Sequence, residues 1–98
     1  MHYQCIRIYR FRRGRLGSVV SSVRRALLSA LMAQTGFLRY RWVTTADDRA
    51  VSESVWETEE QAAFADVVES DWVRAHVSRE LEGLPDLLLG PVEVDVAA

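Results

Sequence analysis

The sequence lacks lysine and asparagine altogether, and its 98 residues include one cysteine and two prolines. A single thiol, Cys5, excludes an internal disulfide and a metal site built from several thiolates, and a free thiol fits a reducing, cytoplasmic setting. No apolar run approaches the roughly 18 residues of a membrane-spanning helix. Arginines interrupt the apolar residues near the N-terminus, so we expect neither a signal peptide nor a membrane partner.

Acidic residues are missing from the first part of the chain. Residues 1–46 carry nine arginines and no acid, whereas residues 47–98 carry three arginines and all fourteen acids, which gives +9 against 3 − 14 = −11. Such a split indicates either a basic arm for nucleic acid or a fold that interleaves the two parts. The length, with 49% hydrophobic and 27% charged residues, predicts one globular domain over residues 1–98.

Hydrophobic periodicity predicts the element order β-α-β-β-α-β. The expected elements are a strand at 2–12, a helix at 18–34, strands at 37–45 and 49–57, a helix from Thr58 to about Glu69, a helical segment from Ser70 to about Leu81, and a strand at 92–96. Ser18 is the expected cap of the first helix, and Ser70-Asp71 the expected cap of the last helical segment. Thr58 and Gln61 form a capping box at the start of the helix between them.

This order predicts an α+β, ferredoxin-like fold with a four-stranded antiparallel sheet in the order 4-1-3-2 and both helices on one face. The other face carries large apolar residues on several strands, which a monomer would expose. We therefore expect a homodimer in which two sheets pack face to face, as in a dimeric α/β barrel.

The same strand order gives the charge split a structural meaning, because it places each basic strand beside an acidic one. The residues concerned are Arg7, Arg10 and Arg12 on the first strand, Arg39 and Arg41 on the second, Glu53 and Glu57 on the third, and Glu93 and Asp95 on the fourth. The acids of the third strand would also repel phosphate, so no nucleic-acid partner is expected.

Several motifs in fixed order carry a family resemblance. They are Gly36-Phe37 before the second strand, Trp56-Glu57-Thr58 at the end of the third, Glu59-Glu60-Gln61-Ala62 at the helix start, and the segments 70–76 (SDWVRAH) and 84–94 (LPDLLLGPVEV). Together they resemble the antibiotic biosynthesis monooxygenase family of the dimeric α/β-barrel superfamily. The resemblance implies a ligand pocket between the sheet and the helices of each subunit.

One branch of that family oxidises polycyclic phenolic or anthrone-like molecules with dioxygen and without a cofactor. Its site pairs an asparagine with a tryptophan four residues later on the third strand, and Ser52 and Trp56 stand at those positions. The resemblance thus implies a cofactor-independent monooxygenase for a small aromatic molecule. Trp56, Trp72 and Ser52 are its expected binding residues. Arg7, Tyr40 or His76 is the expected anion partner or proton acceptor.

Two other readings stay open. A haem-binding or haem-degrading protein would use His76 as the iron ligand, although that branch also uses an asparagine, and Asp66 stands where it has a helical tryptophan. A ligand-binding or structural dimer without chemistry is the second reading. There Trp56 would be a core residue and Arg7 a cross-strand ion-pair partner. The two histidines lie 74 positions apart, so no dedicated metal site is expected.

Overall fold

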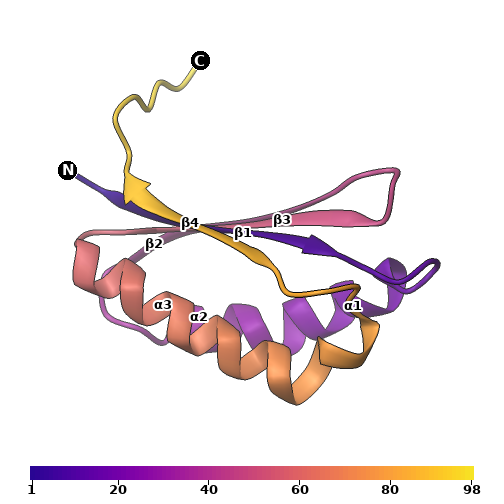
Figure 1. Cartoon of the computed structure of the whole chain (residues 1–98). Helices are drawn as coiled ribbons and strands as arrows, with labels where there is room; N and C mark the ends of the chain where they lie inside the picture. Colours follow the sequence, from indigo (N-terminus) through magenta and orange to yellow (C-terminus); the bar gives the residue numbers. More distant parts are fainter.

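The fold is a sheet of four antiparallel strands with all helical segments on one face (Figure 1). A computed structural model describes all of residues 1–98. Its elements are β1 (Tyr3–Arg10), α1 (Leu16–Ser22), η1 (Val23–Leu27), α2 (Leu28–Met32), β2 (Phe37–Thr44), β3 (Arg49–Trp56), α3 (Glu59–Trp72), η2 (Val73–Val77), η3 (Ser78–Glu80) and β4 (Asp86–Pro91). The strand order β2-β3-β1-β4 confirms the predicted ferredoxin-like fold and the order 4-1-3-2.

The first helical rod is formed by α1, η1 and α2, which follow one another without a break, η1 being a π-helical turn. Its buried residues recur every four positions at Val19, Val23, Leu27 and Leu31, which is the spacing of a helix that buries one apolar side. The predicted start at Ser18 is wrong. The helix begins at Leu16, and the Ser18 hydroxyl donates to the carbonyl oxygen of Arg15 at 2.9 Å instead of capping free N–H groups.

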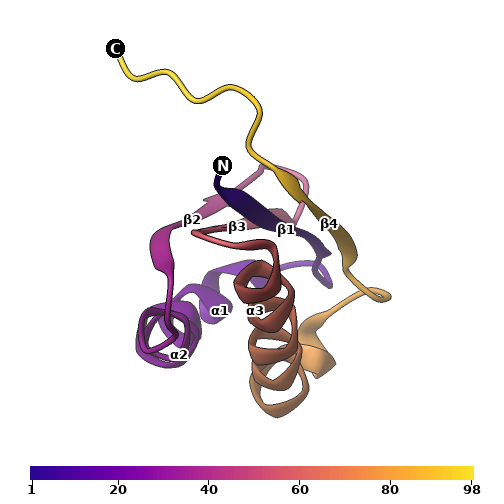
Figure 2. The same cartoon turned by 90° about the vertical axis from the view of Figure 1, so that its left-hand side faces the viewer.

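The second rod begins with the predicted capping box, in which Thr58 and Gln61 satisfy each other's backbone N–H groups. It runs on through Ser70 to Trp72, so the predicted new start at Ser70-Asp71 is wrong. The Ser70 hydroxyl accepts a hydrogen bond from Arg7 instead of capping a helix. Seen end on, both rods lie beneath the sheet (Figure 2). None of the helices is both long and apolar enough to span a membrane.

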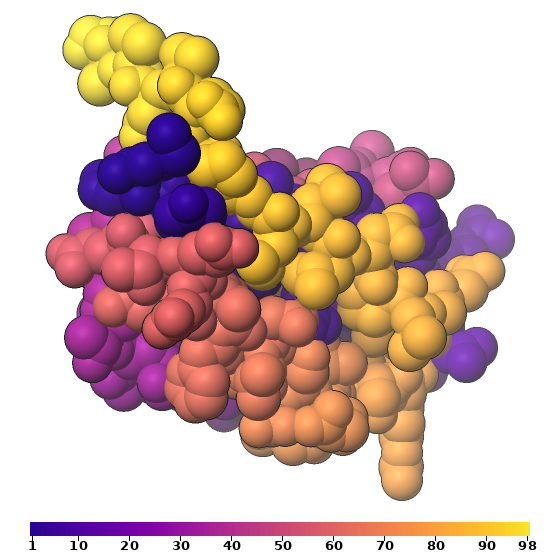
Figure 3. Space-filling model, turned by 60° about the vertical axis from the view of Figure 1, so that its left-hand side comes forward, coloured from indigo at the N-terminus to yellow at the C-terminus, as the bar shows by residue number.

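The fourth strand is not where the alternating valines predict it. β4 is Asp86–Pro91, and it pairs with β1 so that Leu87 lies opposite Arg7 and Leu89 opposite Cys5. Gly90 and Pro91 look like turn residues in the sequence, but an edge strand tolerates a proline, whose missing N–H is not needed there. Residues 92–98 form no helix or strand, and they leave the sheet on the side opposite the helices (Figures 1 and 3).

This shift of the fourth strand changes the charge pairing. Arg41 faces Glu53 across β2 and β3, with 3.9 Å between the charged groups, as predicted. Arg10 pairs with Asp86 of β4 at 2.9 Å, and not with Glu93 or Asp95, which lie beyond the strand. The expected acidic neighbours of the first strand in segment 92–96 are therefore wrong.

The face of the sheet away from the helices carries the apolar side chains that the sequence predicts, together with charged ones such as Arg41 and Glu53. Ile6 and Ile8 on β1 and Val51 and Val55 on β3 are only half-buried there, and Leu88 on β4 is 54% exposed. We call this surface the open face.

Candidate functional site

A cluster of polar side chains lies in the interior, between the sheet and α3. Arg7 and Tyr9 come from β1, Ser52 from β3 and Glu69 from α3, and each is at most 7% exposed. Tyr40 of β2 joins them through its hydroxyl. Arg7 stands opposite Ser52 in the strand pairing, so both side chains point toward the helices. Buried ionisable groups are costly unless partners satisfy them, so their contacts decide what they do.

Glu69 is the centre of this cluster. The Tyr9 hydroxyl donates to the Glu69 carboxylate at 2.5 Å, and the nearby Ser52 side chain lowers the pKa of that carboxyl group. Ser52 in turn shares a hydrogen bond of 2.8 Å with the Tyr40 hydroxyl. Hydroxyl groups from three strands therefore lie on the helix side of the sheet near one carboxyl group, and the hydroxyl of Tyr9 binds it directly.

Arg7 supplies the positive charge beside this carboxyl. One of its terminal nitrogens donates to the side chain of Asp66, to the Ser70 hydroxyl, and to the Asp66 carbonyl oxygen at 2.9 Å. Its Nε is buried without a partner, as is the indole nitrogen of Trp42. A buried donor without an acceptor costs about 1–3 kcal/mol. These two donors can therefore accommodate an additional acceptor atom.

Burial shifts the ionisation of the cluster. Desolvation raises the pKa of Glu69, and Asp66 adds to the rise, while Tyr9, Ser52 and Arg7 oppose it. Burial and the nearby Glu69 charge raise the pKa of both Tyr9 and Tyr40, so these phenols stay protonated. Burial raises the pKa of the Cys5 thiol to about 12, which makes it unreactive. Glu69 is thus the member whose pKa moves up from the acidic range, as a general base requires.

Aromatic rings surround the cluster. The Tyr9 ring lies 5.5 Å from that of Trp42 and 6.3 Å from that of Trp72, and the Trp72 indole donates to the Ser22 hydroxyl at 3.0 Å. Trp56 is fully buried at the far end of β3, where it meets the edge of Phe37. These rings fill the space in which the family resemblance implied a pocket.

Of the six residues predicted for the site, the structure brings Arg7, Tyr40 and Ser52 together. Trp72 touches the cluster through Tyr9, whereas Trp56 lies four residues beyond Ser52 on the same face of β3 and donates to Ser54 at 2.8 Å. His76 is separate from all of them. It is exposed on η2, in a shallow hollow shared with Arg74, Arg79 and Glu80, so a haem ligated there would lie outside the core.

Glu69 and its neighbour Asp66 were not predicted as site residues. The signal was present in the spacing, because Ala62, Ala65, Glu69 and Trp72 recur every three or four positions and are all buried on α3. A carboxylate on an otherwise apolar helical stripe indicates a buried, specifically partnered group.

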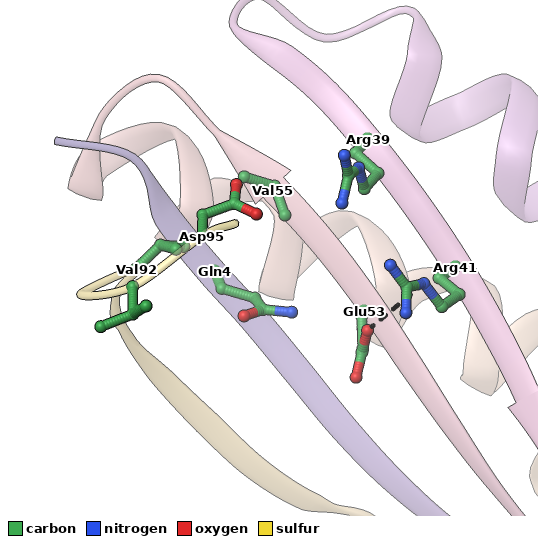
Figure 4. A pocket seen from close by; sticks show the side chains of 8 residues that line it. Gln4, Arg39, Arg41, Glu53, Val55, Val92 and Asp95 are labelled. Atoms are coloured by element: carbon green, nitrogen blue, oxygen red, sulfur yellow. Dashed lines mark ion pairs between the residues drawn. The ribbon is translucent and has the colours of Figure 1, made fainter. Parts of the chain in front are cut away.

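Five hollows on the molecule lie elsewhere, and none of the five is lined by Arg7, Tyr9 or Glu69. One of about 160 Å³ lies on the open face, where Val92 and Asp95 of the C-terminal segment stand near Gln4 and Arg39 (Figure 4). No group of three or more histidine, cysteine, aspartate or glutamate side chains comes together as a metal site.

No protein-family model matches the sequence, and no curated protein matches it. Solved structures share its fold at low sequence identity. SnoaB, a cofactor-independent oxygenase from Streptomyces nogalater, superposes with a TM-score of 0.79 at 14% identity, covering 99% of this chain and 98% of that one. A monooxygenase from the gene ActVA-Orf6 of Streptomyces coelicolor, in complex with the ligand nanaomycin D, superposes with a TM-score of 0.76 at 16% identity. The match covers 98% of this chain and 92% of that one.

A dimeric ferredoxin-like protein from an uncultured marine organism gives a TM-score of 0.76 at 12% identity, over 99% of this chain and 92% of that one. These likenesses confirm the fold that the sequence motifs implied, which is the fold of antibiotic biosynthesis monooxygenases.

Proposed function

We propose that the chain is a cofactor-independent monooxygenase that oxidises a small polycyclic phenol or anthrone with dioxygen. The fold likeness to an oxygenase described as cofactor-independent supports the reaction class. A similar monooxygenase in complex with nanaomycin D supports a flat aromatic ligand. The observation that carries the proposal is the buried Glu69 carboxyl, held by the Tyr9 hydroxyl beside the unpartnered Nε of Arg7.

In the proposed reaction Glu69 removes a proton from the substrate's ring CH₂ group. Arg7 stabilises the negative charge that moves to the ring oxygen, and the Tyr40 and Ser52 hydroxyls donate hydrogen bonds to it. The carbanion forms a C–O bond with dioxygen, and Glu69 returns its proton to give a hydroperoxide. Loss of water leaves a ketone, so one oxygen atom enters the product and one enters water. The substrate supplies all the electrons, and no external reductant is needed.

A substrate reaches this cluster only if the aromatic side chains above it move. Trp42 and Trp72 flank Tyr9 on the helix side. The remaining predicted binding residue, Trp56, would form the wall at the Phe37 end. Substrate entry is therefore expected to change the intrinsic tryptophan fluorescence.

We also propose that the working form is a homodimer packed through the open face. Half-buried Ile6, Ile8, Val51 and Val55 leave an apolar area on that face that a second copy would cover. One of the similar structures is described as a dimeric ferredoxin-like protein, which supports this assembly.

The direct test is oxygen uptake with an anthrone, comparing the native chain with Glu69→Gln. The native chain is expected to turn the substrate over, and removal of the base is expected to lower kcat by about 10²–10⁴-fold. Glu60→Gln, an exposed position on the same helix, is the matched control and should keep full activity. If no anthrone or phenol of such a panel supports oxygen uptake, the chain is a dimer without this chemistry.

A further inference from the structure

We propose that Trp42 determines substrate specificity at this site, by donating its indole N–H to a second oxygen of the substrate. The inference rests on the proposed function and adds a binding residue to it. It also narrows the substrate class to polycyclic molecules that carry a hydroxyl or carbonyl oxygen on an outer ring, besides the ring oxygen that Arg7 holds.

The three tryptophans differ in what their indole N–H groups bind. Trp56 donates to Ser54 at 2.8 Å, and Trp72 donates to Ser22 at 3.0 Å. The indole nitrogen of Trp42 is equally buried but has no partner, although a buried indole N–H usually has one. Because an indole N–H donates and never accepts, the group that would satisfy it is an acceptor such as an oxygen atom.

The position of Trp42 in the sheet places this free donor beside the site. Trp42 lies opposite Ser52 in the pairing of β2 with β3, and Ser52 lies opposite Arg7 in the pairing of β3 with β1. The three side chains therefore belong to one row across three strands. The two residues whose buried donors have no partner, Arg7 and Trp42, stand on either side of Ser52. A flat ligand that lies across β3 can offer a separate oxygen to each of them.

The indole ring of Trp42 crosses the sheet toward the proposed base. Its centre lies 5.5 Å from the Tyr9 ring and 6.3 Å from the Phe11 ring, and both of these rings come from β1. Since β3 separates β2 from β1, the indole ring lies over β3, where the inward residue Ala50 is small. The Tyr9 hydroxyl binds Glu69. An oxygen held by Trp42 therefore belongs to the same ligand whose reacting carbon meets Glu69.

The alternative is that the Trp42 ring only fills the core. Trp42→Phe separates the two roles, because it keeps an aromatic ring against Tyr9 and Phe11 and removes the N–H. The variant loses no hydrogen bond within the chain, so it is expected to fold with the native circular dichroism spectrum. A role in packing alone would change the turnover of all substrates by the same factor.

The test is oxygen uptake with anthrone and with the four monohydroxyanthrones that carry the hydroxyl on an outer ring. For at least one hydroxyanthrone, Trp42→Phe is expected to lower kcat/KM by at least about tenfold, and for anthrone by less than about twofold. Comparing variant with native chain on each substrate cancels the intrinsic reactivity of that substrate. Thr44→Val, at the next position of β2 on the same side and exposed, is the matched control and should lower none of these values.

The native chain provides a second measurement that does not depend on the folding of a variant. A methyl group in place of the preferred hydroxyl keeps the size and removes the acceptor. This methylanthrone is expected to have a kcat/KM at least about tenfold lower than the hydroxyanthrone, after correction for the uncatalysed rates.

The outcomes distinguish this inference from the function on which it rests. If the native chain takes up oxygen with none of these substrates, the proposed function fails and the role of Trp42 fails with it. If the native chain turns the substrates over, but does not prefer a hydroxyl to a methyl group, only the role of Trp42 is overturned. The same holds if Trp42→Phe lowers kcat/KM equally for anthrone and for every hydroxyanthrone.

Discussion

Burial of Glu69 destabilises its ionised form, and the same residue is the base of the proposed reaction. The residue is 2% exposed, and the direct hydrogen-bond donor to its carboxyl group is the Tyr9 hydroxyl at 2.5 Å. Burial is the largest influence on the pKa of this carboxyl group and raises it, so ionisation costs more in the folded chain than in the unfolded chain. This difference links the stability of the fold to pH.

The sign of this linkage follows from the raised pKa. Between the ordinary pKa of a glutamate, about 4.3, and the raised pKa of Glu69, the folded chain binds more protons than the unfolded chain, so its stability falls as pH rises. Glu69→Gln removes this dependence, because the amide keeps an acceptor for Tyr9 and carries no charge. Urea unfolding midpoints between pH 4.5 and 8 are expected to decline less for Glu69→Gln than for the native chain. Parallel curves for the two proteins would show that Glu69 is ionised at no cost in the folded state.

Three of the five residues of this cluster were predicted from the sequence. Ser52 was expected because it stands where the resembled family has an asparagine, and Arg7 and Tyr40 were expected as anion partners or proton acceptors for the substrate that the resemblance implies. Glu69 was missed because a glutamate on a helix is usually solvated. Only its register with Ala65 and Trp72 on the buried stripe distinguishes it. His76 was expected from the family resemblance of segment 70–76, and the π-helical turn η2 leaves it exposed.

At the scale of elements, the junction between β2 and α3 depends on a glycine. Gly36 has φ of +84°, a conformation that L-residues rarely adopt. A Cβ atom at this position would collide with the side-chain amide of Gln61, the same group that closes the capping box with Thr58. The backbone at the start of β2 and the capping box at the start of α3 therefore depend on each other through the Gly36–Gln61 contact.

Gly36→Ala is expected to destabilise the chain by the strain of positive φ, about 1–2 kcal/mol, and by about 1 kcal/mol more for the disturbed cap. Gly83→Ala is the matched control, because Gly83 also has φ of +84° but has open space where the Cβ would stand. Thermal or urea unfolding measures both. Equal losses for the two variants would mean that the capping box does not depend on Gly36.

The elements that the sequence predicted well are those whose pattern is local. β2, β3 and the capping box follow from alternation and from Thr58-Gln61 spacing. The fourth strand could not be placed, because two segments compete for it. Leu87-Leu88-Leu89 has no alternation, and 92–96 has an ideal one, but only the leucines lie opposite β1 in the fold. The position of the fourth strand therefore depends on which segment can pair with β1, and not on the local β propensity of the segment.

At the scale of the whole molecule, the charge split along the chain corresponds to ion pairs of two kinds within the fold. Arginines of the first part pair with acids of the second across strands, as Arg41 does with Glu53, and between sheet and helix, as Arg7 does with Asp66. The fold therefore uses the separation of charge along the chain to bring its two parts together.

The central claim is that Glu69 is the base of a buried oxygenation site, and the pH dependence of turnover tests it most directly. With an anthrone as substrate, kcat/KM of the native chain is expected to rise with pH through an apparent pKa above the ordinary range of a glutamate, because only the carboxylate accepts the proton. Glu69→Gln is expected to lose that rise together with most of the rate, and Glu60→Gln is expected to retain both. A pH profile that is the same in the native chain and in Glu69→Gln would contradict the account.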